Sequence, residues 1–134
     1  MTPTAANRYL ADRVMTATPA QLVGMLYDIT VRSLVAGGTA LAEGDRPTAS
    51  KHLLKAQDAV GELRCSLDVS TGKLATSLDA LYAYAYVRIV RGMVQGDQAA
   101  VAEVLTIMQE LREAWRQACL QPAPSAPAAL AASR

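Results

Sequence analysis

The residues of this chain with the widest catalytic repertoire are one histidine, His52, and two cysteines, Cys65 and Cys119. A di-iron helical bundle needs Glu-x-x-His pairs on two helices, and no carboxylate stands three residues before His52. Zinc sites use cysteines and histidines at short regular spacings, which this sequence lacks. We therefore predict a protein that is not an enzyme, with no metal site and no cofactor. His52 is interpreted as a solvated residue near a helix start.

Phosphate binding and thiol chemistry find equally little support. The pair Gly37-Gly38 lies inside a helical pattern and lacks the flanking strand that a phosphate-binding loop requires. Neither cysteine has a neighbouring histidine that would lower its pKa. We expect both to be unpaired, reduced thiols, because cytoplasmic thiols rarely form disulfides.

Charge and hydropathy exclude further classes of protein. Thirteen basic and twelve acidic residues give a net charge of +1, so we expect neither nucleic acid nor an anionic membrane as a partner. The mean hydropathy of +0.14 is on the apolar side, yet no stretch approaches the roughly 20 apolar residues of a membrane span. The first residues show no apolar run after a basic patch, so we expect no cleaved secretion signal and a cytoplasmic location.

Surplus apolar surface is the most informative feature. Between positions 80 and 94 the only charged residues are Arg88 and Arg91. Tyr82 and Tyr86 are four residues apart and share a helix face, whereas Tyr84 is turned about 200° from Tyr82. One bundle seam cannot bury both sets. Either side chains of neighbouring helices cover the excess, or the surface is a groove that receives an amphipathic helix from a partner.

The elements that carry these residues all have helical periodicity. Thr18, Pro19 and Gln21 form a capping box with proline at the first helical position, and Asp97 is a good N-cap for the last helix. The predicted helices are 19–43, 47–67, 73–94 and 98–119. Short turns between them favour antiparallel neighbours, so we predict an all-α, antiparallel up-down four-helix bundle. Leu26 belongs to the expected seam of the first helix, and Leu74 begins that of the third.

Two segments flank the predicted bundle of residues 16–119. Residues 120–134 are rich in proline and small side chains, which cannot build a core, so we interpret them as a disordered tail. Residues 1–15 include Tyr9, Leu10, Val14 and Met15. This short apolar segment either packs permanently on the bundle or acts as a displaceable cover over a groove.

Several motif runs, in order, resemble the flagellar export chaperone family known as FliS. They are TATP at 16–19, LVGMLYD at 22–28, LKAQD at 54–58, ELRCSLD at 62–68, LYAY at 81–84 and LREAW at 111–115. The resemblance extends from about residue 9 to residue 118. One departure is Ile29, where the family commonly has glycine after Tyr-Asp, so the packing there must differ.

The resemblance implies a cytoplasmic chaperone that binds the disordered C-terminal region of flagellin, prevents premature polymerisation and delivers its client to the export gate of the flagellar type III apparatus. Tyr9 and Leu10 would form the N-terminal cover and the contact with the export gate. The competing hypothesis is a non-enzymatic helical adaptor or regulatory bundle without an unfolded client. The expected client groove comprises Leu22, Met25, Tyr27, Leu54, Gln57, Leu81, Tyr84 and Val87.

Overall fold

A computed structural model of the chain describes residue 5 and residues 17–121. Its elements are α2 (Pro19–Ala42), α3 (Arg46–Cys65), the short 3-10 turn η1 (Val69–Thr71), α4 (Lys73–Gln95) and α5 (Gln98–Leu120). The predicted all-α four-helix fold is confirmed. The predicted cover at Tyr9 and Leu10, and nearly all of the predicted tail, lie outside the described residues. Leu120, assigned to that tail, is instead the last residue of α5.

Polar caps define where the helices begin. The amide of Gln21 donates to Thr18 Oγ1 over 3.1 Å, and the Thr18 amide donates to Gln21 Oε1 over 2.9 Å, so the predicted capping box is present. The carboxylate of Asp97 accepts from the Ala100 amide over 3.0 Å, as expected for the N-cap of α5. Asp45 caps α3 in the same way through the Thr48 amide, so α3 begins at Arg46, one residue before the predicted start.

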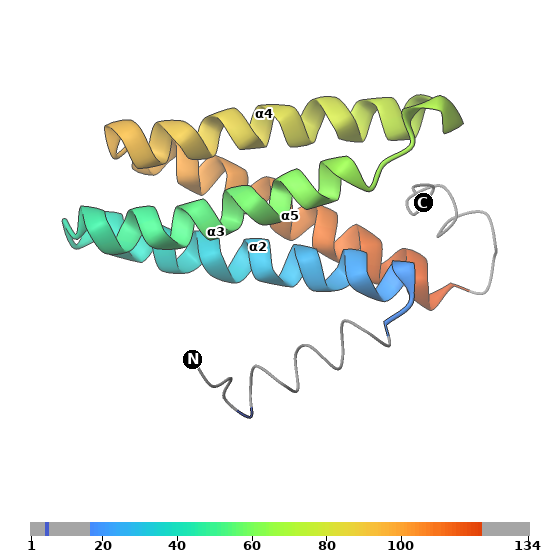
Figure 1. Cartoon of the computed structure of the whole chain (residues 1–134), viewed down its shortest axis with the longest axis horizontal. Coiled ribbons are helices and arrows are strands. Elements are labelled where there is room, and N and C mark those ends of the chain that lie inside the picture. The colour runs from blue at the N-terminus through green and yellow to red at the C-terminus, as the bar shows by residue number, and fades with distance from the viewer. Residues whose placement is uncertain (1–4, 6–16, 122–134) are drawn as a thin grey trace.

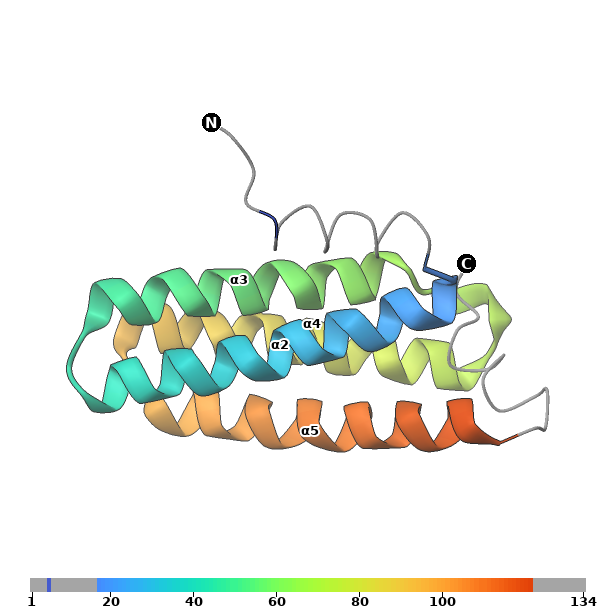
Figure 2. The ribbon, with the colours of Figure 1, turned by 90° about the horizontal axis from the view of Figure 1, so that it is seen from below.

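The four helices run alternately up and down, and α5 returns to pack against α2 (Figures 1 and 2). Two contacts set the register between α3 and α4. Arg46 donates to the carbonyls of Met93 and Val94 at one end, and Arg64 pairs with Asp79 at the other. The start of α3 therefore lies beside the end of α4, so these two helices are antiparallel.

The core is largely apolar, with buried polar side chains at Thr30, Ser33 and Gln57 and a hydrogen bond between two tyrosines. Tyr27 on α2 and Tyr82 on α4 are each 2% exposed, and their hydroxyls bond to each other across the bundle. Burial raises the pKa of both phenols, because it disfavours the charged form. The ring of Tyr27 also packs against Trp115 of α5, with centroids 6.4 Å apart. Side chains from three helices therefore meet at Tyr27.

Helices α2 and α3 come close together near Gly37. A Cβ atom at this position would lie 2.6 Å from Leu53 Cδ2, which is shorter than any ordinary contact. Gly37 therefore allows the Leu53 side chain to press against the α2 backbone. The opposite end of the same helix pair, between the first half of α2 and the end of α3, is hollowed instead.

Candidate functional site

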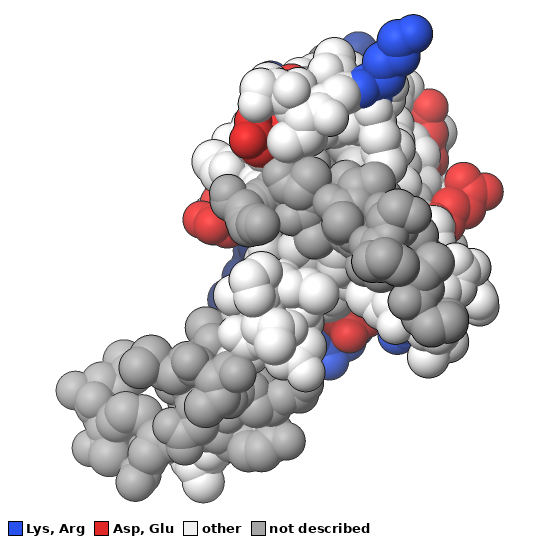
Figure 3. Space-filling view, turned by 90° about the vertical axis from the view of Figure 1, so that its right-hand side faces the viewer, with Lys and Arg blue, Asp and Glu red and all other residues white. Residues whose placement is uncertain are grey.

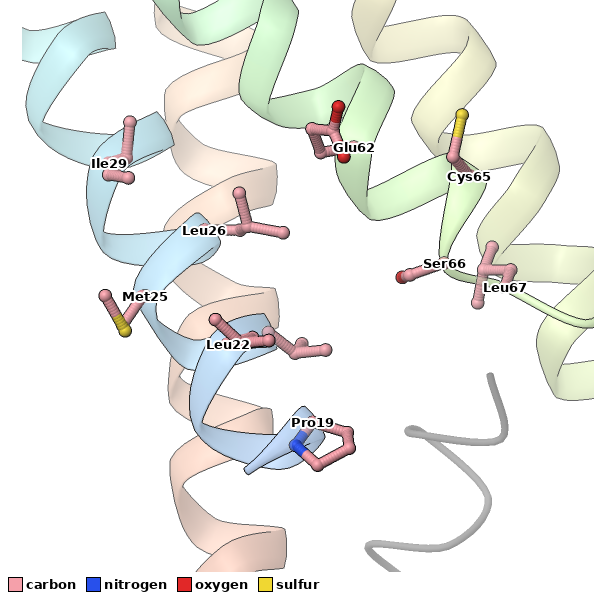
Figure 4. A pocket seen from close by; sticks show the side chains of 10 residues that line it. Pro19, Leu22, Met25, Leu26, Ile29, Glu62, Cys65, Ser66 and Leu67 are labelled. Carbon is pink, nitrogen blue, oxygen red and sulfur yellow. The ribbon is translucent and has the colours of Figure 1, made fainter. Parts of the chain in front are cut away.

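The hollow at that end is a groove of about 430 Å³, which we call the α2/α3 groove. Four large apolar side chains of α2 line it: Leu22 and Leu26 point towards the end of α3, and Met25 and Ile29 lie on the outer side of α2 (Figure 4). Leu22, Met25, Leu26 and Ile29 are each only partly buried, so the groove has an accessible apolar wall. The lining residues are Pro19, Leu22, Val23, Met25, Leu26, Ile29, Glu62, Cys65, Ser66 and Leu67.

Contacts with α5 hold the first half of α2 in place. The indole nitrogen of Trp115 donates to the Ala20 carbonyl over 3.2 Å. About two turns further along α2, Asp28 pairs with Arg116 over 3.3 Å and with Arg112 over 3.6 Å. These contacts all lie on the α5 side of α2. The apolar residues that point towards α3 are therefore presented by an anchored helix.

The polar groups of the groove are few. Glu62 is the one carboxylate among its lining residues. The hydroxyl of Ser66 donates to the Leu63 carbonyl over 2.8 Å, so its hydrogen is already used. Cys65 is exposed and unpaired. The groove thus offers mainly apolar contact, which suits the apolar face of a helix or an extended peptide. Its one negative charge comes from Glu62.

A second apolar hollow lies on the other side of α2, against α5. It measures about 530 Å³ and opens more widely to solvent than the α2/α3 groove. Cys119, which is also exposed and unpaired, lies in its wall. Among the described residues, its lining is Ala20, Gln21, Gly24, Trp115, Arg116, Cys119 and Leu120. The start of α2 is therefore flanked by apolar hollows on both sides.

Two of the eight predicted groove residues, Leu22 and Met25, line the α2/α3 groove. Tyr27 and Gln57 do not, because both side chains are buried in the bundle. Tyr27 belongs to the core cluster through its contacts with Tyr82 and Trp115. Neither residue offers a surface that a partner could contact in this structure.

The remaining four predicted residues lie elsewhere on the bundle. Leu54 and Val87 are 51% and 61% exposed, and the register of α3 and α4 brings them to a similar level along the axis. Tyr84 donates to the carboxylate of Glu103 on α5, so it lies on the other flank of α4. Leu81 is partly buried. The predicted set therefore spans several faces and does not form one groove.

The prediction missed some of the residues that build the groove. Leu26 was assigned to the seam, yet it lies between the core and the groove and contributes to both. Ile29, noted only as a departure from the family pattern, fills part of the wall. Leu67 adds an apolar side chain just after α3. The signal available in the sequence was the nearly continuous apolar character of 22–29.

Charged side chains of both signs surround this end of the molecule. Figure 3 looks onto the end of the bundle and shows described acidic and basic side chains around the edges of that view. None of the helices within residues 17–121 is long and apolar enough to cross a membrane. In the same residues, no three His, Cys, Asp or Glu side chains gather as metal ligands would.

Comparison with known proteins agrees with the resemblance. The family described as "Flagellar protein FliS" matches residues 1–122. The "Flagellar secretion chaperone FliS" of Bacillus subtilis (strain 168) is 33% identical over 110 residues, which is 82% of each chain. The protein of the same name from Salmonella typhimurium is 34% identical over 106 residues, or 78% of each chain. The one from Escherichia coli (strain K12) is 33% identical over 111 residues, 81% of this chain and 82% of its own. The names of these relatives denote a secretion chaperone, which is a non-enzymatic role. The chain described here belongs to the FliS family of flagellar proteins.

Proposed function

We propose that this protein is a cytoplasmic flagellar export chaperone that binds the disordered C-terminal region of flagellin. Bound client cannot polymerise prematurely and is delivered to the export gate of the flagellar type III apparatus. The observation that carries the proposal is the α2/α3 groove in a member of the FliS family, because its apolar wall suits an amphipathic segment that has nothing to fold against when free.

Physically, the proposed reaction is folding coupled to binding. Client residues become helical as their apolar side chains enter the groove, and ordering them costs about 2–5 kcal/mol of the gross interaction energy. Burial of apolar surface gives binding a negative heat-capacity change. The net charge of +1 makes long-range electrostatics a small part of the affinity.

Calorimetry with a flagellin C-terminal peptide tests this function. The wild-type chain should bind one peptide per chain at micromolar concentrations or better, and the peptide should gain helical circular dichroism. Met25→Glu should weaken binding at least tenfold, since it places a charge in the apolar wall of the groove. Val35→Glu is the matched control, because Val35 is on the same helix, is 47% exposed and lies outside the groove.

Met25 is a better position for a charged substitution than Leu26 or Tyr84. Leu26→Asp would damage the groove and the packing together, and Tyr84→Glu would break the bond to Glu103 and set two carboxylates against each other. Met25 has neither complication. If the wild-type chain binds no flagellin tail, the adaptor-bundle hypothesis replaces the chaperone.

We further propose that the segment 1–15 covers part of the groove in the free protein, with Tyr9 and Leu10 contacting the export gate during delivery. The support is the apolar content of the segment directly before the start of α2. Amide exchange should show its protection changing when client is added, and Tyr9→Ala should weaken capture of the client complex by the export gate component. Identical protection with and without client would make the segment a fixed part of the scaffold.

A further inference from the structure

The surface between α2 and α3 changes its chemistry along its length. Ile29 lines both the apolar α2/α3 groove and a second hollow of about 260 Å³ further along the same helix pair. That hollow, which we call the basic hollow, is lined by Ile29, Arg32, Ser33, Ala36, His52 and Lys55. From Pro19 to Ala36, α2 rises about 25 Å. An apolar half and a basic half therefore follow each other along one side of α2.

The cations of the basic hollow have no carboxylate partner within residues 17–121. Asp28, one turn before Arg32, pairs with Arg112 and Arg116 of α5 instead. Neither Arg32 nor Lys55 takes part in any of the ion pairs formed among the described residues, and no carboxylate lines the hollow. His52 is partly buried in the wall of this open hollow.

The single carboxylate of the apolar half adds a second constraint. Glu62 lines the α2/α3 groove at the end nearest the basic hollow, level with Ile29 in Figure 4 and about two turns along α3 from Lys55. An acidic residue of a bound segment is therefore repelled at the boundary between the two halves and attracted beyond it, in the basic half. Such a combination of attraction and repulsion selects one placement of a partner over others.

We propose that the two halves together recognise one class of client segment: a stretch with an apolar face whose carboxylates follow about two helical turns beyond it. The inference rests on the proposed function and names what its groove selects. Apolar residues of the segment contact Leu22, Met25 and Leu26, and its carboxylates bind Arg32, Lys55 and His52. Charge complementarity, and not apolar area alone, then determines which part of a client occupies this side of the bundle.

Designed peptides test the proposal with the full chain. Three peptides of about 18 residues carry the same leucine face and differ only in the two turns next to it: glutamines throughout, glutamates on the N-terminal side, or glutamates on the C-terminal side. One acidic peptide should bind about three- to tenfold more tightly than the neutral one, as expected for two or three partly exposed ion pairs. Raising NaCl from about 50 to about 300 mM should shrink that difference.

Two double variants test which residues cause the preference for an acidic peptide. Arg32→Gln/Lys55→Gln should abolish the preference for the acidic peptide and change the affinity of the neutral peptide by less than about twofold. Lys51→Gln/Lys73→Gln is the control, because it removes the same charge from exposed positions outside the hollow. Both double variants should keep the wild-type melting temperature, since all four side chains are exposed.

Three results would overturn the inference while leaving the proposed function intact: equal affinity for all peptides, equal effects of the two double variants, or inorganic phosphate that binds the basic hollow more tightly than the acidic peptide does. In each of these cases the flagellin tail still binds the wild-type chain. Failure of the flagellin tail to bind would instead reject the proposed function itself.

Discussion

The buried pair Tyr27 and Tyr82 yields a quantitative prediction. Each side chain is 2% exposed, and each hydroxyl is the other's side-chain partner. Tyr82→Phe keeps the ring but leaves the Tyr27 hydroxyl buried without that partner, which costs about 1–3 kcal/mol of unfolding free energy. For a chain of 134 residues this lowers Tm by roughly 4–12 °C. Tyr27→Phe should have a similar effect.

The double variant separates the hydrogen bond from other effects. Tyr27→Phe/Tyr82→Phe removes both polar groups and leaves an apolar core of the same shape, so its loss should be smaller than the sum of the single losses by about 1–2 kcal/mol. Urea unfolding followed by circular dichroism measures all three variants. Tyr86→Phe should change little, because Tyr86 is 41% exposed and makes no side-chain hydrogen bond to the described residues. Neutral single variants with additive effects would refute the reasoning.

Three other predictions concern packing, pH and the thiols. Gly37→Ala should lower the unfolding free energy by about 1–3 kcal/mol, because its Cβ would overlap Leu53. Gly38→Ala should instead raise it by up to about 1 kcal/mol, because the nearest contact of its Cβ would be at 3.6 Å. Equal effects of the two variants in urea unfolding would contradict this. Because the pKa of both buried tyrosines is raised above 10.0, the unfolded chain releases these protons first, so the contribution of this pair to stability should be constant below pH 10 and fall above it. The Tyr27→Phe/Tyr82→Phe variant should lose less in an alkaline titration of the urea midpoint, and an unchanged slope would argue against it. Cys65 and Cys119 are both exposed, so a thiol reagent should titrate two thiols in the native, unreduced protein, and a disulfide in fresh material would contradict this.

The helices could be predicted from sequence because their limits are local. Thr18 and Asp97 cap helices through their own side chains, and glycine at position 96 adopts a left-handed conformation with φ of 65° at the end of α4. The N-cap at Asp45 was less apparent from the sequence, because Pro47 placed the predicted start of the helix at position 47. Leu74 was assigned to a seam by its spacing, but it lies in the first turn of α4 and is 44% exposed.

The groove could not be predicted residue by residue. Helix α2 is apolar around most of its circumference between positions 22 and 29, so periodicity does not tell which side faces the core. Leu26 and Tyr27 differ by a rotation of about 100°. Tyr27, predicted for the groove, is in the core, whereas Leu26, predicted for the seam, packs against the core and also reaches the groove. The basic hollow is lined by Arg32 of α2 and Lys55 of α3, and no local sequence pattern indicates that residues of two different helices will be neighbours.

The two native cysteines provide the most direct test of the central claim, that client occupies the α2/α3 groove. Cys65 lines this groove and Cys119 lines the hollow on the other side of α2, and both are exposed. The alkylation rate of each thiol can be measured by mass spectrometry with and without a saturating flagellin C-terminal peptide. The account predicts that bound peptide slows alkylation of Cys65 at least several-fold and has a smaller effect on Cys119. An unchanged rate at Cys65 with the peptide demonstrably bound would show that the client binds elsewhere.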